Sequence, residues 1–346
     1  MTIKEIAALT GVSPATVSLV LNNKEGVSDE TRKRIQKVVE ELNYALPQNR
    51  KKHLRGNIRF LKYAAHGMVV EENQGFIASI IDHIEVECRR CSYDLIMTGC
   101  NRETAPDTFR MVAANPLDGV IVLGSEMNEE QIQMMYQIKA PMVVIDNPMS
   151  YEQVDAIVMA NEDIAFEAVH YLHGLGHRSI GYFQSSVRVA NFEKRQVGFQ
   201  AALQKLDLKS AAVIPLTPTL QGAYRDMKAA LARESVVIPS GIFADNDTIA
   251  IGAMKALHEC GYRIPSDVSI IGVDDIPFSA ISTPALTTMR ISRSFIGKFA
   301  VEMLLKRIQH AEYPFCRIQT SGQLIERHST AVYSDQTEMT STLTAG

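Results

Sequence analysis

The residues best suited to contact a macromolecule stand in the first 21 positions, where small side chains follow a tight turn. Ser13 is a typical helix N-cap residue, and Pro14 fits the first helical position, where a missing N–H has no cost. Val17 and Val20 then point toward a core. The opposite face of this short helix carries Ser13, Ala15, Thr16 and Leu19. Small side chains let a helix lie against base-pair edges, so the segment predicts a helix that enters a DNA groove.

A preceding helix must hold that helix in place. Thr2 fits an N-cap position, and Ile3, Ile6 and Ala7 form an apolar stripe with helical spacing. Gly11 then ends the helix and supplies the positive φ that such a turn needs. Capped helical hairpins also occur without any DNA role, so a purely structural hairpin is the alternative.

The distribution of charge favours the DNA interpretation. Residues 1–62 contain twelve Lys and Arg against six Asp and Glu, a net charge of +6, whereas the rest of the chain carries −10. A third helix, capped by Ser28, presents part of this charge on its outer face, as Arg32, Lys33, Arg34 and Lys37. A basic end on an acidic body favours local contact with phosphates, although a run of charge can also be a solvated face.

A basic segment over residues 47–57 follows the three helices. Pro47 can open a short helix there and Gly56 can close it, and Leu54 is the single apolar residue among four cations. A segment with so little to bury is expected to be disordered when free. Two interpretations stay open: a simple basic linker, or a hinge helix that folds on DNA and inserts Leu54 as a wedge into the minor groove.

From residue 58 onward strands and helices alternate. Apolar runs such as Ile58–Ala64, Val120–Leu123 and Val268–Val273 predict strands, and stretches such as Phe76–Arg90 and Thr248–Cys260 predict helices between them. This order predicts an α/β core of two doubly wound parallel-sheet lobes, with a ligand cleft at the carboxyl ends of their strands. We therefore expect an all-α helix-turn-helix headpiece over residues 1–46, the hinge or linker over 47–57, the two-lobed core over 58–333 and a disordered tail over 334–346.

Several classes of protein are excluded. No uncharged apolar run is long enough to span a membrane, and the chain starts without the apolar stretch of a secretory signal, so we expect a cytoplasmic protein. Five cysteines argue against a disulfide framework, and no further ligands complete a metal site around Cys88, Cys91 and Cys100. The chain has no nucleophile elbow, P-loop or dinucleotide-binding motif. We expect no enzyme activity, no cofactor and no metal.

Several long motifs follow one another along the chain. They are TIKEIAALTGVSPATVSLVLN and VSDETRKRIQKVVEELNY near the start, PQNRKKHLR in the basic segment, and LHGLGHRSIGYF, RQVGF, ADNDTIAIGAMKAL and IGVDDIPFSAISTPALTTM farther on. With these motifs the chain resembles the lactose-repressor-type (LacI/GalR) family of bacterial transcription regulators, over nearly its whole length up to about residue 330.

The resemblance implies a fold, a function and partners. The fold is a helix-turn-helix headpiece, a hinge helix and two lobes like those of periplasmic sugar-binding proteins. Such proteins act as homodimers on palindromic operators in double-stranded DNA. A small effector in the cleft changes their affinity for DNA. In the family it is usually a sugar or sugar phosphate and sometimes a purine, and here we expect a carbohydrate.

The resemblance also implies which side chains face DNA. In the headpiece they are Ser13, Pro14, Ala15, Thr16, Leu19 and Asn22, to which we add Thr2, and in the hinge they are Lys52 and Leu54. Thr16 and Asn22 would contact phosphates, which position a protein without specifying sequence. Many members carry Arg or His at the position of Leu19, whereas leucine can only meet a thymine methyl group. We therefore expect a different operator.

Five core residues match positions that bind the effector or are typical of such a site. They are Phe76, Asp146, Arg195, Asn246 and Asp274. Arg195 takes the place of the family's clamping arginine, whose planar fork can make two parallel hydrogen bonds. The first lobe opens with IRFLKYAAHGMVVEENQGF, which departs from the family pattern. Phe76 fits a ring-stacking position in that lobe, and Asn73 and His66 are further candidates.

Two alternatives remain open. The core alone would also fit a sugar-binding protein of the transport type, although the basic headpiece and the missing signal argue against it. Within the regulators, some members use a phosphorylated carrier protein as corepressor, and the sequence does not exclude such a partner.

Overall fold

The computed structural model of the chain describes residues 3–21, 26–41, 56–233 and 236–333. The chain divides into two compact units, Met1–His53 and Leu54–Gly346. Outside the described residues lie Thr2, Asn22, Lys52 and Leu54, most of the expected hinge and the expected tail.

Three helices form the first unit. They are α1 (Ile3–Thr10), α2 (Pro14–Leu21) and α3 (Asp29–Glu41). Gly11 turns the chain between α1 and α2 with a φ of +63°, which confirms the expected turn glycine. The Ser13 hydroxyl accepts a hydrogen bond from the Thr16 backbone N–H at 3.1 Å and so caps α2 as expected. The small core between the helices consists of Ile6, Ala7, Val17, Val20 and Ile35.

The second unit contains two lobes, each built around a six-stranded sheet. The first lobe comprises β1 (Gly56–Tyr63), α4 (Phe76–Arg90), β2 (Tyr93–Cys100), α5 (Ala105–Ala114), β3 (Gly119–Leu123), α6 (Glu129–Met135), β4 (Met142–Ile145), β5 (Asp155–Met159), α12 (Arg293–Gln309) and β11 (Arg317–Thr320). The second comprises α7 (Asn161–Gly174), β6 (Ile180–Ser185), α8 (Ala190–Lys205), β7 (Ser210–Leu216), α9 (Leu220–Leu231), β8 (Gly241–Ala244), α10 (Asp247–Glu259), β9 (Ser269–Asp274), α11 (Pro277–Ile281), β10 (Thr287–Arg290) and β12 (Gln323–Ile325).

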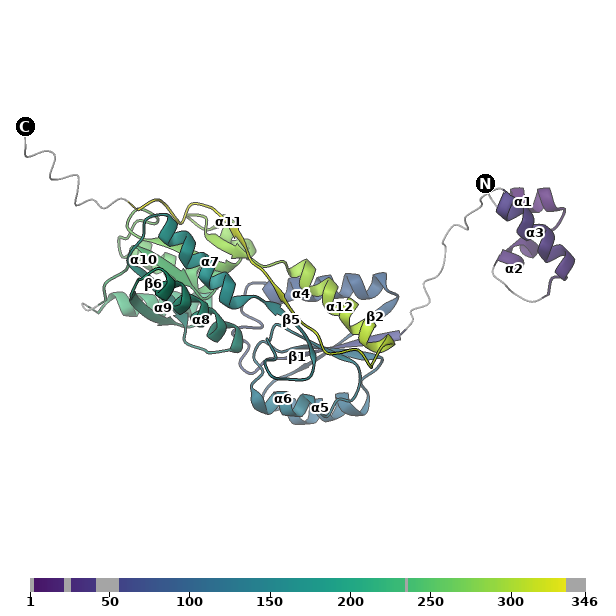
Figure 1. Cartoon of the computed structure of the whole chain (residues 1–346), viewed down its shortest axis with the longest axis horizontal. Coiled ribbons are helices and arrows are strands. Elements are labelled where there is room, and N and C mark those ends of the chain that lie inside the picture. Colours follow the sequence, from purple (N-terminus) through teal and green to yellow (C-terminus); the bar gives the residue numbers. More distant parts are fainter. Residues whose placement is uncertain (1–2, 22–25, 42–55, 234–235, 334–346) are drawn as a thin grey trace, which may run out of the picture. The chain divides into compact units, whose positions relative to one another are not determined.

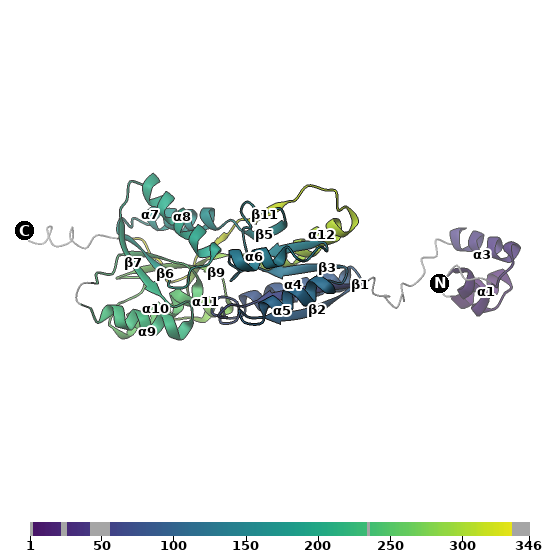
Figure 2. The same ribbon diagram turned by 90° about the horizontal axis from the view of Figure 1, so that it is seen from below.

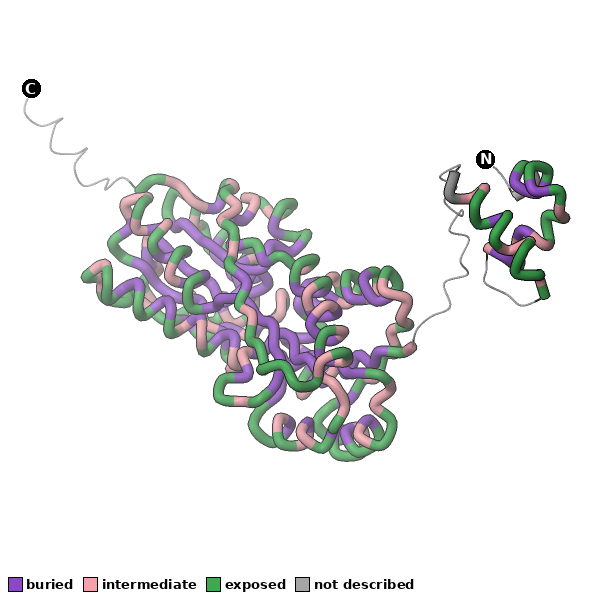
Figure 3. The backbone as a smooth tube through the Cα atoms, turned by 45° about the vertical axis from the view of Figure 1, so that its right-hand side comes forward, coloured by how far each residue is buried: buried purple, intermediate pink, exposed green. Residues whose placement is uncertain are grey.

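Both sheets are parallel with helices on two faces, which confirms the predicted fold class. The strand orders are β11-β5-β4-β3-β1-β2 and β12-β10-β9-β8-β6-β7, and only the β10–β12 pair is antiparallel among the described strands. In the first lobe α4 and α12 cover one face of the sheet and α5 and α6 the other (Figure 1). In the second lobe α7 and α8 lie opposite α9 and α10 (Figure 2). This layering places buried strands between exposed helix surfaces (Figure 3).

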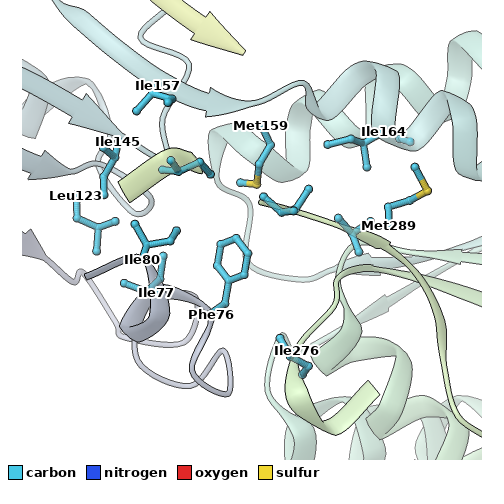
Figure 4. Packing of buried hydrophobic residues seen from close by; sticks show 14 of the residues in the cluster. Phe76, Ile77, Ile80, Leu123, Ile145, Ile157, Met159, Ile164, Ile276 and Met289 are labelled. Carbon is cyan, nitrogen blue, oxygen red and sulfur yellow. The ribbon is translucent and has the colours of Figure 1, made fainter. Parts of the chain in front are cut away.

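The chain passes between the lobes three times. It crosses after β5, before α12 and after β11, and the Ala160 N–H donates to the Thr320 carbonyl at 2.9 Å where the first and third crossings meet. One apolar cluster continues through this region, from Ile145 and Ile157 in the first lobe to Ile164 and Met289 in the second (Figure 4). The crossings therefore join the two lobes through a packed apolar connection. The carboxyl ends of the strands in both lobes lie beside it and form a cleft.

The predicted elements are largely confirmed, with some omissions. Helix α4 has the expected bounds, and other predicted elements differ by a few residues. The prediction did not include α5, β5, β7, α11 and β10 to β12. Strand β1, the first strand of the core, also starts earlier than expected, at Gly56, because residues 56–63 pair in register with 93–100 of β2.

Candidate functional site

The five expected effector-binding residues surround one cavity between the lobes. Phe76 and Asp146 come from the first lobe, and Arg195, Asn246 and Asp274 come from the second. The cavity has a volume of about 20 Å³, which is room for a single water molecule. All five side chains are buried. In this conformation the cleft is closed, so a larger molecule can enter only when the lobes separate.

Arg195 is the centre of the site and is only 2% exposed. Its Nε donates to the Asn161 side-chain oxygen at 2.8 Å, and its Nη1 donates to the Asp245 carbonyl. Its Nη2 lies 3.4 Å from Asp274 Oδ1. The guanidinium therefore uses much of its fork within the protein, and it is a less open clamp than the sequence indicates.

A hydrogen bond across the cleft joins the lobes. Asp146 follows β4 with a φ of +61°, and its Oδ1 accepts from the Asn191 side-chain amide at 2.9 Å. The same amide donates to the Asp146 carbonyl at 3.0 Å. Asn191 in turn accepts from Asn161, the residue that binds Arg195. A continuous polar chain thus runs from the first lobe to the guanidinium in the second.

Asp274 and Phe76 meet the start of α12. Asp274 ends β9 with a φ of +113°, and its carbonyl accepts from Arg293 Nη1 at 2.9 Å. The Arg293 guanidinium also lies 5.8 Å from the centre of the Phe76 ring, within the range of a cation–π contact. Arg293 therefore connects the aromatic wall of the first lobe to the strand end of the second.

The side chains of Asn246 and Asp247 stabilise a helix end and a loop next to the cavity. The Asn246 side-chain oxygen accepts from the Ile249 N–H at 2.9 Å and caps α10. Asp247 is fully buried and accepts from Ser279 Oγ at 2.5 Å, Thr288 Oγ1 at 2.6 Å and the Ile276 N–H at 3.1 Å. This carboxylate braces the loop after β9.

The unusual opening of the first lobe is held by a buried carboxylate. Glu126 accepts from the backbone N–H groups of His66, Gly67, Val69 and Val70 at 2.9 to 3.2 Å. The loop carries Val69 and Asn73 into the cavity wall. His66 does not line the cavity; its Nδ1 accepts from the Met68 N–H at 3.3 Å. The altered segment thus forms a rigid wall of the cleft.

Burial changes the proton affinity of the acids in this region. It raises the pKa of Asp146 and of Asp274 to about 6, and that of Asp247 to about 7 from an ordinary value of 3.8. Desolvation is the main cause in each case, because a buried carboxylate loses its hydration. For Asp247, the negative charge of Asp274 adds to this effect.

This shift predicts how stability depends on pH. Between about pH 4 and pH 7 the folded protein holds a proton on Asp247 that the unfolded chain has released, so this group makes the free energy of unfolding fall as pH rises. Replacing Asp247 with Asn removes that dependence. Urea unfolding at several pH values should show the variant gaining stability relative to wild type as pH rises through this window. Asp267→Asn is the control with the opposite trend, because the Arg263 hydrogen bond lowers the pKa of Asp267.

A larger hollow lies beside the cavity, and both are lined by Met159. Its volume is about 420 Å³, and charged residues of both lobes surround it, including Glu162, Lys194 and Arg317. Lys194 pairs with Glu162 at 2.7 Å, and Arg317 donates to the Met149 carbonyl at 3.1 Å. The charged residues around the larger space are thus bonded to groups of the protein itself. The smaller cavity is lined by polar side chains from both lobes.

In the headpiece, α2 presents the face expected to meet DNA. Ser13, Pro14, Ala15 and Leu19 are exposed, while Thr16 is half-buried and its hydroxyl lies 2.9 Å from that of Ser13. Leu19 is 37% exposed, so this apolar side chain is accessible for contact with another molecule. Lys33 and Arg34 of α3 are exposed as well.

Two other expectations concern metals and membranes. Over the described ranges, no group of three or more His, Cys, Asp or Glu side chains is arranged to hold a metal ion. Cys88 and Cys100 are buried thiols whose pKa is raised by burial. Among the described helices, none is long and apolar enough to cross a membrane.

Comparison with known proteins identifies the family. Residues 2–46 match the model described as "Bacterial regulatory proteins, lacI family", and residues 169–330 match a "Periplasmic binding protein-like domain". The HTH-type transcriptional repressor PurR of Vibrio campbellii is 32% identical over 336 residues, which cover 95% of this chain and 98% of that protein. The chain belongs to the lacI family of bacterial regulatory proteins.

Solved structures agree with the fold of this lacI-family protein. A lac repressor dimer bound to operator and the anti-inducer ONPF is 22% identical with a TM-score of 0.72, and covers 96% of this chain and 99% of its own. A LacI family transcriptional regulator from Enterococcus faecium with bound ribose is 25% identical with a TM-score of 0.69, covering 80% and 100%. The match to the lacI-family model and to the PurR repressors makes this chain a DNA-binding transcriptional regulator.

Sequence reasoning missed several residues of the cleft in this lacI-family protein. Val69, Met159, Val189, Asn191 and Phe192 also line the cavity. Asn191 and Phe192 stand four and three residues before Arg195 on α8, so helical spacing from Arg195 could have found them. Val69 could not be found in this way, because its loop reaches the cleft through contacts with residues distant in the sequence, such as the hydrogen bond to Glu126.

Proposed function

We propose that this protein is a transcriptional repressor whose affinity for operator DNA is controlled by a small effector in the cleft. One observation carries the proposal: side chains from distant strand and helix ends, chosen from the sequence for effector binding, converge on one closed cavity between two lobes. The hydrogen bond between Asn191 and Asp146, which joins the two lobes across the cavity, can break and re-form as the lobes move. Such a switch works only if the effector binds the open and closed states with different affinity.

The proposed effector is a small molecule rich in hydrogen-bonding groups, with carbohydrates the first class to test and purines the second. The bound ribose of the Enterococcus faecium relative supports the first class. Phe76, Asp146, Arg195, Asn246 and Asp274 are the proposed contacts. A phosphorylated carrier protein as corepressor is a second candidate that the sequence leaves open.

The proposed DNA contacts are Ser13, Pro14, Ala15, Thr16 and Leu19 on α2, together with Thr2, Asn22, Lys52 and Leu54. The exposure of the α2 side chains supports the first group. Because the proposed partner is chromosomal DNA, we propose that the protein is located in the cytoplasm. The proposed domain ranges are those expected from the sequence.

We propose a homodimer because apolar side chains remain exposed along one edge of the core. Strand β2 is an edge strand that exposes Ile96 and Met97, and Val86 on the neighbouring α4 is exposed as well. In the second lobe α11 exposes Phe278 and Ile281. Unpaired edges and apolar patches are features that proteins cover with a partner. Two copies joined there would present two headpieces to an inverted repeat.

Selection of binding sites by the full-length protein tests the DNA role. Duplexes selected from a random pool should contain an inverted repeat, and the logarithm of the binding constant should fall steeply and linearly with the logarithm of salt concentration. Leu19→Ala should weaken binding to the selected site by about 1 kcal/mol, roughly fivefold, while binding to random duplex stays unchanged. Lys33→Ala should instead weaken both. A pool without enrichment would refute the proposed contacts of the headpiece with operator DNA.

A further inference from the structure

The wall of the cleft carries more negative than positive charge. Among the described residues that line the cavity, the acids are Asp146 and Asp274 and the one cation is Arg195. Behind the wall stand two further buried carboxylates, Asp245 and Asp247. Asp245 pairs with Arg188 at 3.1 Å, whereas the hydrogen-bond donors to Asp247 are two hydroxyls and a backbone N–H.

The cations near the cavity already serve other groups. Arg195 donates to Asn161 and to the Asp245 carbonyl and lies 3.4 Å from Asp274. Arg293 donates to the carbonyls of Asp274 and Asp275 at 2.9 and 3.0 Å. A phosphate or carboxylate would need a fork with two parallel free N–H groups. To provide one here, the protein would have to break bonds to buried acceptors, which is costly.

The acids, in contrast, retain acceptor capacity. A carboxylate has about four lone-pair sites. The hydrogen bonds to the Asp146 carboxylate come from Ser125 and Asn191, and the one to the Asp274 carboxylate comes from Arg195. Phe76 and Phe192 supply apolar faces beside these acceptors. Such a wall fits a ring that offers O–H or N–H donors.

We propose that the cleft selects an uncharged, donor-rich ring molecule and rejects its phosphorylated or carboxylated counterpart. The inference rests on the proposed effector role of the cleft. It concerns the charge of the effector, which the proposed function leaves open. Neutral sugars and neutral nucleobases or nucleosides share the required chemistry, and the experiment separates them.

The test measures binding of matched pairs to the full-length protein by thermal shift and calorimetry. The pairs are glucose and glucose 6-phosphate, glucose and glucuronate, ribose and ribose 5-phosphate, guanosine and its monophosphate, and inosine and its monophosphate. We expect a neutral member of one class to bind at least tenfold more tightly than its anionic counterpart. A phosphorylated or carboxylated member that binds more tightly, or a panel in which no neutral member binds, would overturn the proposal.

Charge variants provide the second measurement. Asp274→Asn should raise the ratio of anionic to neutral affinity at least tenfold, and Asp146→Asn should do the same if the first variant does not fold. Asp82→Asn, an exposed site on α4, is the matched control and should leave the ratio unchanged. An unchanged ratio in both cleft variants would contradict the proposal. Operator binding is measured on the same samples. If operator binding persists while the affinity ratio is unchanged, the charge proposal fails and the proposed repressor function does not.

Discussion

Replacing Arg195 with alanine will lower the free energy of unfolding by about 3–5 kcal/mol, because it leaves buried acids without their cation. Asp274 would lose its partner at 3.4 Å, and the Asn161 oxygen and the Asp245 carbonyl would lose their donors. The same change should abolish the thermal shift that the effector produces. Urea unfolding gives the first effect and a ligand titration gives the second.

Two further variants separate charge from geometry at this position. Arg195→Lys keeps the charge but cannot supply three planar donors, so it should recover part of the stability and little of the effector response. Lys194→Ala, the next residue on the same helix, removes a half-exposed pair with Glu162 and should cost at most about 1 kcal/mol. If Arg195→Ala were no more harmful than Lys194→Ala, Arg195 would not be the centre of the site.

Gly198→Ala should destabilise the core by about 3 kcal/mol or more, the upper range for an overpacked site. A Cβ atom at this position would lie 2.0 Å from the Glu162 carbonyl oxygen and 2.8 Å from the Glu162 Cα. Both atoms belong to the backbone of α7, so the contact cannot be relieved by a rotamer change. Helix α8 must move away from α7 and take Arg195 with it, so the effector response should also weaken.

Gly174→Ala is the matched control for that variant. Gly174 is the last residue of α7, and a Cβ there would meet nothing within 4 Å. Alanine favours the helix by up to about 1 kcal/mol relative to glycine, so this variant should be as stable as wild type or more stable. Circular dichroism melts of the two variants compare them directly. Equal melting temperatures would show that the α7–α8 contact is looser than described.

The sequence predicted the elements with strong periodicity and missed those that depend on neighbours. Helix α4 carries an apolar stripe along its whole length and was found with its bounds. Strand β11 has the polar sequence RIQT and exists because it pairs with β5 at the edge of the first sheet. Strand β7 lies at the other sheet's edge and contains Pro215, which removes one donor from the local pattern. For such edge strands, the neighbouring strand with which they pair determines their position, and their own sequence does not predict it.

The candidate site was also predicted only in part: its residues could be named from the sequence, but their contacts could not. Family motifs indicated Arg195, Asn246 and Asp274, whereas Asp146 was expected from its place after a strand and Phe76 from a ring-stacking position. The structure places all five around one cavity. Their hydrogen bonds could not be derived from spacing, because Asn161, Asp245 and Asp274 reach Arg195 from three different elements. The sequence therefore indicated a free clamp, whereas packing produced an arginine that is already bound on several sides.

The three crossings between the lobes also determine the order in which the protein can be completed during synthesis. The first lobe obtains α12 and β11 only after nearly all of the second lobe has been translated, and β12 of the second lobe comes last. Until then α4 lacks the helix that packs against it, and its apolar side chains at Ile80 and Ile84 lack part of their cover. A chain that ends early therefore has two unfinished lobes, and neither half of the switch can be produced as one continuous fragment.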